Sequence, residues 1–181
     1  MWEKQELKKK EYLNIFACVS WYTYIKRRHM RRTDRETTRE EAWRIFDQSA
    51  YSVLSMSYRN RPYATALSVA RIDETLYFHC ARDGEKIRAM RENPNVCLHS
   101  VARMENCAEG FTVYYASCTI RGIAQEVVDE EERHRALLAL CRTFIPQSMD
   151  MAEQEIRDLR SVTAVWSITV QEITGKRNAE K

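Results

Sequence analysis

Glycine and proline are scarce in this chain, with four glycines and three prolines among 181 residues. This scarcity excludes collagen-like, low-complexity and linker-rich chains, which need many of both residues. No internal repeat is found either, which excludes solenoid and propeller arrays. The composition, 44% apolar and 30% charged, is that of an ordinary globular protein with one domain and a substantial core.

A strong charge of one sign is also lacking in most of the chain. Residues 1–29 hold seven Lys/Arg against three Asp/Glu, whereas residues 30–181 hold 22 against 23. The larger segment therefore has no broad basic surface of the kind that binds phosphate backbones. We expect no nucleic-acid partner.

The six cysteines do not form a recognisable framework, because no CxxC motif occurs. A chain of this length needs no disulfide staples, and several of the cysteines lie in apolar, strand-like segments. We expect reduced thiols in a cytoplasmic protein. Cys97 and His99 share one strand face, and together with Cys80 or His79 they could bind a metal ion if the fold brings them together. Further ligands at ordinary spacing are missing, so no metal site is predicted.

Residues 1–29 differ in composition from the rest. Their apolar stretch, 13–25, is shorter than the roughly 20 residues that span a bilayer, and no small-residue cleavage site follows it. We interpret 1–29 as an N-terminal extension, either a mis-assigned upstream segment or an added amphipathic helix, with secretion as the remaining alternative. The domain is expected at 30–181, without a membrane partner and stable without the extension.

Periodicity and capping residues predict the secondary structure of 30–181. Thr38 and Glu41 fit a capping box, and Asp129 precedes a strongly periodic apolar pattern. Helices are expected at 38–48, 85–92, 130–144 and 147–160. Strands are expected at 50–57, 62–70, 75–80, 96–102, 111–128 and 161–173, with a polar loop at 103–110 and a break near Gly122. Consecutive hairpins with a few helices indicate an α+β protein with a largely antiparallel sheet, closed or split into a barrel to hide its edges.

The segment 76–86 (LYFHCARDGEK) holds the most informative chemistry. A strand ends, Gly84 allows close approach of the backbone, and Lys86 lies in the first turn of a helix. Free amides at a helix start together with an ammonium group suit a phosphate. A solvated helix start with no ligand is the alternative at this level of evidence.

A family resemblance rests on several motifs in a fixed order. YATALS, YFHCA–x2–G–x–K, ENPNV, FTVYYASCTIRG and AVWSITVQEITGKR together resemble the pyridoxamine 5′-phosphate oxidase superfamily, and its nitroimidazole-reductase-like branch in particular. The resemblance covers nearly all of 30–177. It implies a mostly antiparallel six-stranded split β-barrel with flanking helices, and FMN bound at a homodimer interface.

The resemblance also implies roles for individual residues. Lys86 matches the lysine on the FMN phosphate, and Ser117 falls where a polar side chain reaches the flavin from a neighbouring strand. His79 matches a histidine that faces the active site and is the candidate catalytic residue. Residues matching the strands beside the ribityl chain and the isoalloxazine ring are Ala66, Leu67, Ser68, His79 and Cys80. The implied reaction passes electrons from a reduced nicotinamide to a small acceptor such as a nitroaromatic or a quinone.

Two departures from the oxidases argue against pyridoxamine phosphate as the substrate. Glu85 stands where the oxidases place an arginine next to the phosphate lysine, although Arg82 or Arg88 could compensate. The chain ends in ITGKRNAEK and lacks the oxidases' Trp-Gln-Gly segment and Arg-Leu-His clamp. A haem-binding or haem-degrading split barrel and a non-catalytic flavin carrier remain as alternative functions.

Overall fold

A computed structural model describes residues 30–179 of the chain. Two units are distinguished, one ending at Glu36 and one comprising Thr37–Lys181. The described part of the first contains a 3₁₀ turn, η1 (Thr33–Arg35). The predictions on 1–29 lie outside the described residues. No helix within 30–179 is both long and apolar enough to cross a membrane.

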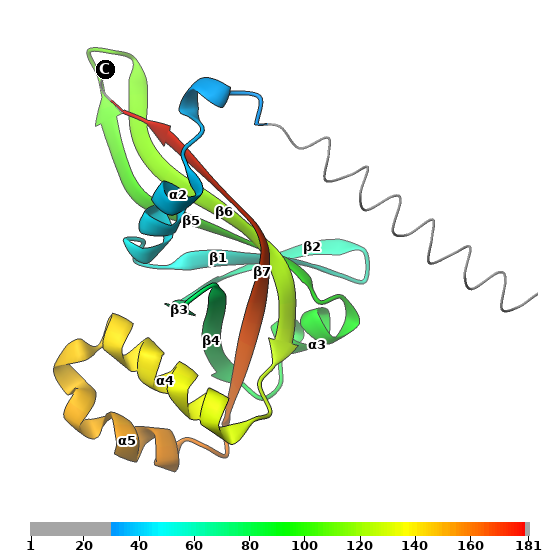
Figure 1. The fold of residues 1–181 in the computed structure, drawn as a ribbon. Coiled ribbons are helices and arrows are strands. Elements are labelled where there is room, and N and C mark those ends of the chain that lie inside the picture. Colours follow the sequence, from blue (N-terminus) through cyan, green and yellow to red (C-terminus); the bar gives the residue numbers. More distant parts are fainter. Residues whose placement is uncertain (1–29, 180–181) are drawn as a thin grey trace, which may run out of the picture. The chain divides into compact units, whose positions relative to one another are not determined.

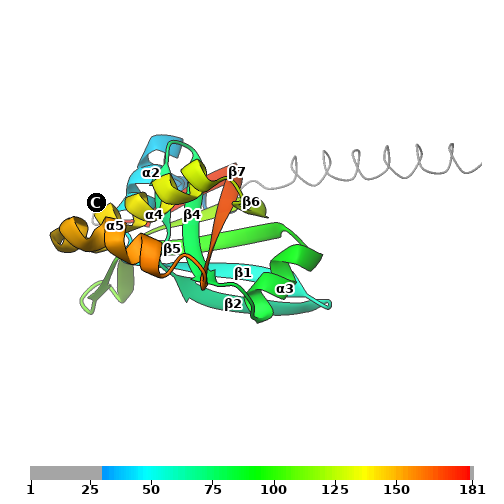
Figure 2. The ribbon, with the colours of Figure 1, turned by 90° about the horizontal axis from the view of Figure 1, so that it is seen from below.

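The second unit is a seven-stranded antiparallel sheet with four α-helices in its described part (Figures 1 and 2). Its strands are β1 (Ser52–Tyr58), β2 (Arg61–Leu67), β3 (Ala70–Ile72), β4 (Thr75–Ala81), β5 (Asn95–Cys107), β6 (Thr112–Glu126) and β7 (Thr163–Asn178). Its helices are α2 (Arg39–Asp47), α3 (Glu85–Glu92), α4 (Glu130–Phe144) and α5 (Met149–Asp158), with a 3₁₀ turn, η2 (Pro146–Ser148), before α5.

The strand order shows why this sheet curls into a barrel. The order is β2-β1-β5-β6-β7-β4-β3, so β2 and β3 are its two edges. Only Ser68 and Val69 separate Leu67 at the end of β2 from Ala70 at the start of β3. A link this short spans roughly 10 Å, which brings the two edges of the sheet together at Ser68. The predicted α+β split barrel is therefore confirmed.

The same link explains why seven strands form instead of the predicted six. Residues 62–70 were expected to form one strand, but the chain leaves the sheet at Ser68 and enters the opposite edge at Ala70. Apolar residues continue through the link, so periodicity alone does not reveal the change of partner. The prediction of a loop at 103–110 is also wrong, because β5 continues to Cys107, which pairs with Thr112 of β6. Its residues are polar because this hairpin extends beyond the core.

Most other elements agree with the sequence predictions. The Thr38 hydroxyl accepts the Glu41 amide, and the Asp129 carboxylate accepts the Glu132 amide, as capping residues should. Helices α3 and α4 have the predicted bounds, and the pairing of β6 with β7 shifts register between Arg121 and Gly122. Strand β7 runs five residues past the predicted end at 173, because β6 supplies a partner that far.

Two hydrophobic clusters stabilise the second unit. The larger one fills the barrel and includes Leu54, Phe78, Leu98, Ile120 and Ile168, covered by α2 and α3. The smaller one joins Tyr77 and Val165 to Ala136, Leu137 and Leu140 of α4. Strand β4 therefore contacts both clusters, one on each face. Helices α4 and α5 form a pair on the β3–β4 side, apart from α3, which packs on β1 (Figures 1 and 2).

Gly175 of the ITGKR motif has a packing role in this fold. A Cβ atom added at Gly175 would lie 2.1 Å from the Thr37 hydroxyl and 2.8 Å from the Ala42 side chain. The Gly175 carbonyl also accepts the Thr37 amide at 3.1 Å. Glycine is required here because the start of α2 lies directly on β7.

Candidate functional site

Strand β4 presents the candidate residues on two faces, because side chains alternate along a strand. Phe78 and Cys80 face the barrel cluster, whereas Tyr77 faces the α4 side, as does His79 two residues further along the strand. The Tyr77 hydroxyl donates to Glu132 at 2.9 Å. Its pKa is raised, first by burial and then by this hydrogen bond to the carboxylate.

Helix α3 begins without a side-chain cap. Its N-cap is Gly84, at φ 146°, a conformation that residues with a Cβ rarely adopt. The Arg88 guanidinium donates to both carboxylate oxygens of Asp83, at 2.9 and 3.1 Å. The pKa of Asp83 is lowered, first by the hydrogen bond from the Gly84 amide and then by the Arg88 charge. Within residues 30–179, no capping side chain accepts a hydrogen bond from the amides of the first helical turn, which begins at Glu85.

Lys86 is half-buried in this first turn, and its Nζ lies 5.8 Å from the centre of the Phe78 ring. No carboxylate of residues 30–179 lies within ion-pair distance of it, whereas Arg88 of the same helix pairs with Asp83 and Arg91 with Glu126. The ammonium group is close enough to act on both candidate residues of β4. The pKa of His79 is lowered, first by the atoms that crowd the ring and then by the Lys86 charge. Burial raises the pKa of the Cys80 thiol, and Lys86 opposes that rise.

Both arginines that could compensate for Glu85 have other partners in the structure. Arg88 is engaged by Asp83, and Arg82 donates to the backbone carbonyl of Arg160 at 3.0 Å. Glu85 itself is exposed and lines a second pocket of about 400 Å³ with Tyr58, Arg59, Arg61, Pro62 and Tyr63. Of Arg82, Lys86 and Arg88, Lys86 is therefore the one left to bind an anion at the start of α3.

A pocket of about 400 Å³ opens beside His79, and we call it the α4–α5 pocket. Ser68 contributes to it from the link between the sheet edges, His79 from β4 and Thr163 from the start of β7. Helix α4 and its C-cap contribute Leu137, Leu140, Cys141, Phe144 and Ile145. Helix α5 and its C-cap contribute Glu155, Ile156 and Leu159. The sequence predicted a helix at 130–144 but no pocket wall, because i, i+3, i+4 apolar spacing is the same in a helix that covers a core and in one that lines a pocket.

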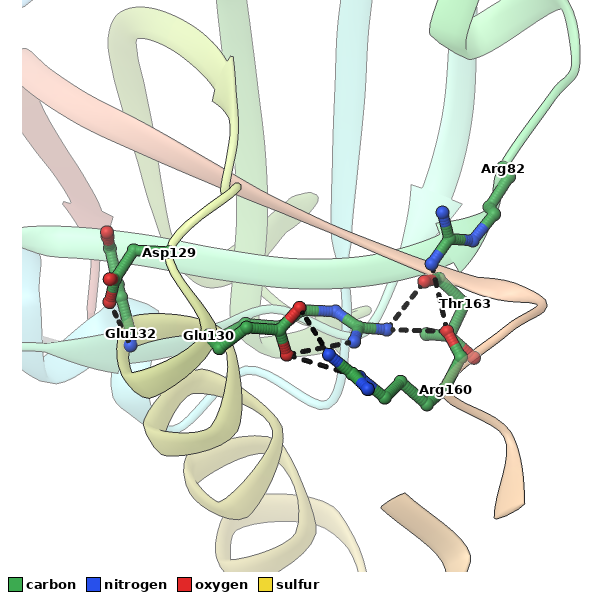
Figure 3. A network of polar contacts seen from close by, with 7 residues as sticks. Arg82, Asp129, Glu130, Glu132, Arg160 and Thr163 are labelled. Atoms are coloured by element: carbon green, nitrogen blue, oxygen red, sulfur yellow. Dashed lines mark hydrogen bonds and ion pairs between the residues drawn. The ribbon is translucent and has the colours of Figure 1, made fainter. Parts of the chain in front are cut away.

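A network of arginines holds one wall of this pocket in place (Figure 3). Arg133 is 7% exposed, and its Nη2 donates to the carbonyls of Arg160 at 3.0 Å and Thr163 at 2.7 Å. Arg160 pairs in turn with Glu130 at 2.9 Å. The segment from Leu159 to Thr163 is thereby tied to the start of α4. No feature of the sequence singled out Arg133, because arginine in an amphipathic helix is usually exposed.

The remaining candidates lie elsewhere in the chain. Ala66 is exposed on edge strand β2, opposite Val53, and Leu67 is half-buried at the end of that strand. Ser117 is 8% exposed on β6, paired with Val101 and Lys176. Nine residues, roughly 30 Å of extended chain, separate Ser117 from Glu126, the β6 residue near the His79 end. Within one chain, the structure brings together Ser68, His79, Cys80 and Lys86, but not Ser117.

Lys176 was missed as a candidate, although its motif was noted. Its Nζ lies 5.8 Å from the centre of the Tyr115 ring, in the row that contains Ser117. Within residues 30–179, no three or more His, Cys, Asp or Glu side chains are grouped as metal ligands would be, and the five described cysteines are free.

Solved structures with the same fold include flavin and haem proteins. A protein described as a 5-nitroimidazole antibiotic resistance protein from Bacteroides thetaiotaomicron is 21% identical, with a TM-score of 0.64, over 77% of this chain and 84% of its own. The flavocytochrome Anf3 from Azotobacter vinelandii is 20% identical, with a TM-score of 0.68, over 86% and 74%. An FAD and heme binding protein from Mycobacterium smegmatis is 16% identical, with a TM-score of 0.67, over 81% and 74%. These likenesses concern the fold.

The sequence itself matches one family over most of its length. No curated protein sequence matches the chain. The sequence model described as pyridoxamine 5′-phosphate oxidase matches residues 38–177, which include the whole sheet up to Arg177, all four described α-helices and every candidate residue. The chain therefore belongs to the pyridoxamine 5′-phosphate oxidase family.

Proposed function

We propose that this protein binds FMN and passes electrons from a reduced nicotinamide to a small acceptor, in the manner of the nitroimidazole-reductase-like branch. The observation that carries the proposal is Lys86, a half-buried ammonium without a carboxylate partner at an uncapped helix start beside His79. Backbone amides and a positive charge at one point suit a phosphate group. These residues fit the cofactor, whereas the carboxylate of Glu85 opposes it and that of Asp83 is neutralised by Arg88.

Each candidate residue has a distinct task in this proposal. Lys86 and the first-turn amides of α3 hold the phosphate. Ala66, Leu67, Ser68 and Cys80 border the flavin, which supplies the electron-transfer chemistry. His79 is neutral at pH 7, because its pKa is lowered from an ordinary value of 6.5, and it offers one N–H and one lone pair to the substrate side.

The proposal includes a homodimer, which the separation of the candidates supports. Ser117 and Lys86 lie at opposite ends of the sheet, so a flavin that touches both needs two chains. A two-fold dimer places one end of a chain against the other end of its partner and makes two equal sites. Light scattering at micromolar concentration should give about twice the chain mass. A monomer that binds FMN at full occupancy contradicts the shared site.

The cofactor is tested most directly by the absorbance spectrum of the purified protein with and without added FMN. A flavin spectrum, with FMN released on denaturation, supports the proposal. Release of FAD would show that an adenylate group is also accommodated. A Soret band would favour haem binding, as the names of the flavocytochrome and of the FAD and heme binding protein suggest.

The reaction is tested by oxidation of a reduced nicotinamide in the presence of nitroaromatic and quinone acceptors. Acceptor-dependent oxidation that requires FMN supports an oxidoreductase, for which we propose a cytoplasmic location. FMN binding without any such turnover would identify a flavin carrier instead.

A further inference from the structure

The α4–α5 pocket exposes more apolar surface than a barrel cover needs. Ile145 and Leu159, at its mouth, are 45% and 50% exposed, and nearby Val162 is 59% exposed. The inner wall consists of Leu137, Leu140 and Phe144. Large apolar side chains left open around a pocket of this size indicate a ligand with an apolar body.

Charge at the pocket is confined to one residue. Glu155 is the only lining residue with a formal charge, and its carboxylate has no ion-pair partner within residues 30–179. Its neighbours on α5 differ, because Glu153 pairs with His134 at 2.9 Å and Asp158 accepts from Gln154 at 2.8 Å. Arg133 donates to the Thr163 carbonyl at 2.7 Å, and Arg82 donates to the Arg160 carbonyl at 3.0 Å, but neither arginine lines the pocket. An unpaired carboxylate at an apolar mouth attracts cations and repels anions.

We propose that the α4–α5 pocket is the acceptor site, that it takes apolar molecules of neutral or positive charge, and that Glu155 excludes anionic ones. Ser68 and His79 line this pocket and also belong to the proposed flavin site, so an acceptor bound here lies next to the flavin. The assignment of the pocket to the acceptor rests on the proposed function. The charge preference of the pocket does not rest on the proposed function, because it concerns binding and not electron transfer.

The preference can be measured with three nitroaromatics that share one ring: 4-nitrobenzylamine as the cation, 4-nitrotoluene as the neutral compound and 4-nitrobenzoate as the anion. In each case the reduced nicotinamide gives a hydride, and one proton comes from solvent. The nitro group becomes a nitroso group, with release of one water and one oxidised nicotinamide. The FMN-loaded full chain is used at low ionic strength, because salt screens exposed charges.

The variants change the charge at one position of α5. Glu155→Lys should lower the ratio of kcat/KM for the cation to that for the anion by about tenfold, and Glu155→Gln by about threefold. The value for the neutral compound should change by less than about twofold. Comparing each variant with the unaltered protein removes the differences in intrinsic reactivity among the three compounds.

Glu153→Lys is the matched control. It makes the same charge reversal on the same helix, but Glu153 does not line the pocket. It should change the cation-to-anion ratio by less than about twofold. An equal effect of Glu153→Lys and Glu155→Lys would mean that the preference reflects the general field of the protein, and would overturn the role of Glu155.

A second readout requires no electron transfer. Binding of 4-chlorobenzylamine and 4-chlorobenzoate to the same proteins is followed by NMR, with Leu137 and Phe144 methyl or ring signals as reporters of the pocket. A preference for the amine that is lost in Glu155→Lys supports the selectivity of the pocket. If this preference is seen but no protein shows turnover, the proposed reaction is overturned and the selectivity stands. Turnover with a ratio that is unchanged in Glu155→Lys overturns this inference and leaves the proposed function standing.

Discussion

Helices α3 and α4 begin in opposite ways. Helix α4 has an Asp129 cap, three glutamates in its first turn and a buried arginine that binds backbone carbonyls. Helix α3 has a glycine cap, no side-chain acceptor for its first-turn amides and an unpaired lysine. Four acidic side chains therefore offset the positive end of the α4 dipole, whereas Glu85 and the Arg88-paired Asp83 are the acidic groups at the start of α3. The start of α4 is stabilised by side chains of the protein itself, and the start of α3 is the one that we propose to bind an anion.

The largest expected effect comes from removing the buried guanidinium on α4. Arg133→Leu should lower the free energy of unfolding by about 2–3 kcal/mol, because two carbonyls lose a charged donor. Urea unfolding measures it. FMN affinity should change little if the α4 start is purely structural. Arg135→Leu, an exposed arginine on the same helix, is the control and should cost less than about 0.5 kcal/mol.

At the start of α3 the expected effect is on the cofactor rather than on stability. Lys86→Ala should weaken FMN binding by about ten- to a hundredfold, because a charge-assisted hydrogen bond of about 1.5–3 kcal/mol is lost. Riboflavin, which lacks the phosphate, should bind both proteins equally. Titration by flavin fluorescence compares the two ligands. Equal losses for both would show that Lys86 supports the fold and that the phosphate binds elsewhere.

Asp129→Ala removes the cap of α4 and gives the converse test. The Glu132 amide loses its acceptor, and stability should fall by about 1 kcal/mol. Thermal unfolding and FMN titration are measured on the same sample. A loss of FMN affinity without a loss of stability would contradict the division of roles between the two helix starts.

The smallest effect concerns the titration of His79. Its pKa in the folded protein lies below the ordinary 6.5, so the unfolded chain binds the proton first and stability falls as the pH drops below about 6.5. Lys86→Ala removes one of the two causes, so the pKa of His79 should rise and this loss of stability should shrink. NMR of the histidine ring protons follows it, with His134, paired to Glu153 on the α4–α5 side, as an internal reference. An unchanged His79 curve would mean that Lys86 does not face it.

Local signals account for the elements that the sequence predicts well. Capping residues and apolar periodicity locate α3 and α4 to the residue, because both are properties of consecutive positions. Ser68 and His79 line one pocket, and Lys86 lies close enough to influence the pKa of His79 and of Cys80, but their grouping as a flavin site stays a prediction. Ser117 does not join them within one chain, because strand spacing alone does not say which end of a long strand faces a site.

The sequence by itself determined the α+β class, the family and most of the helix bounds, all of which depend on neighbouring residues or on ordered motifs. Only the tertiary structure decided that β2 and β3 are opposite edges of one sheet, that Arg133 is buried, and that α4 and α5 form an apolar pocket with His79. These features depend on contacts between residues far apart in the chain, and the same apolar spacing along α4 suits a packed core and an open pocket wall equally.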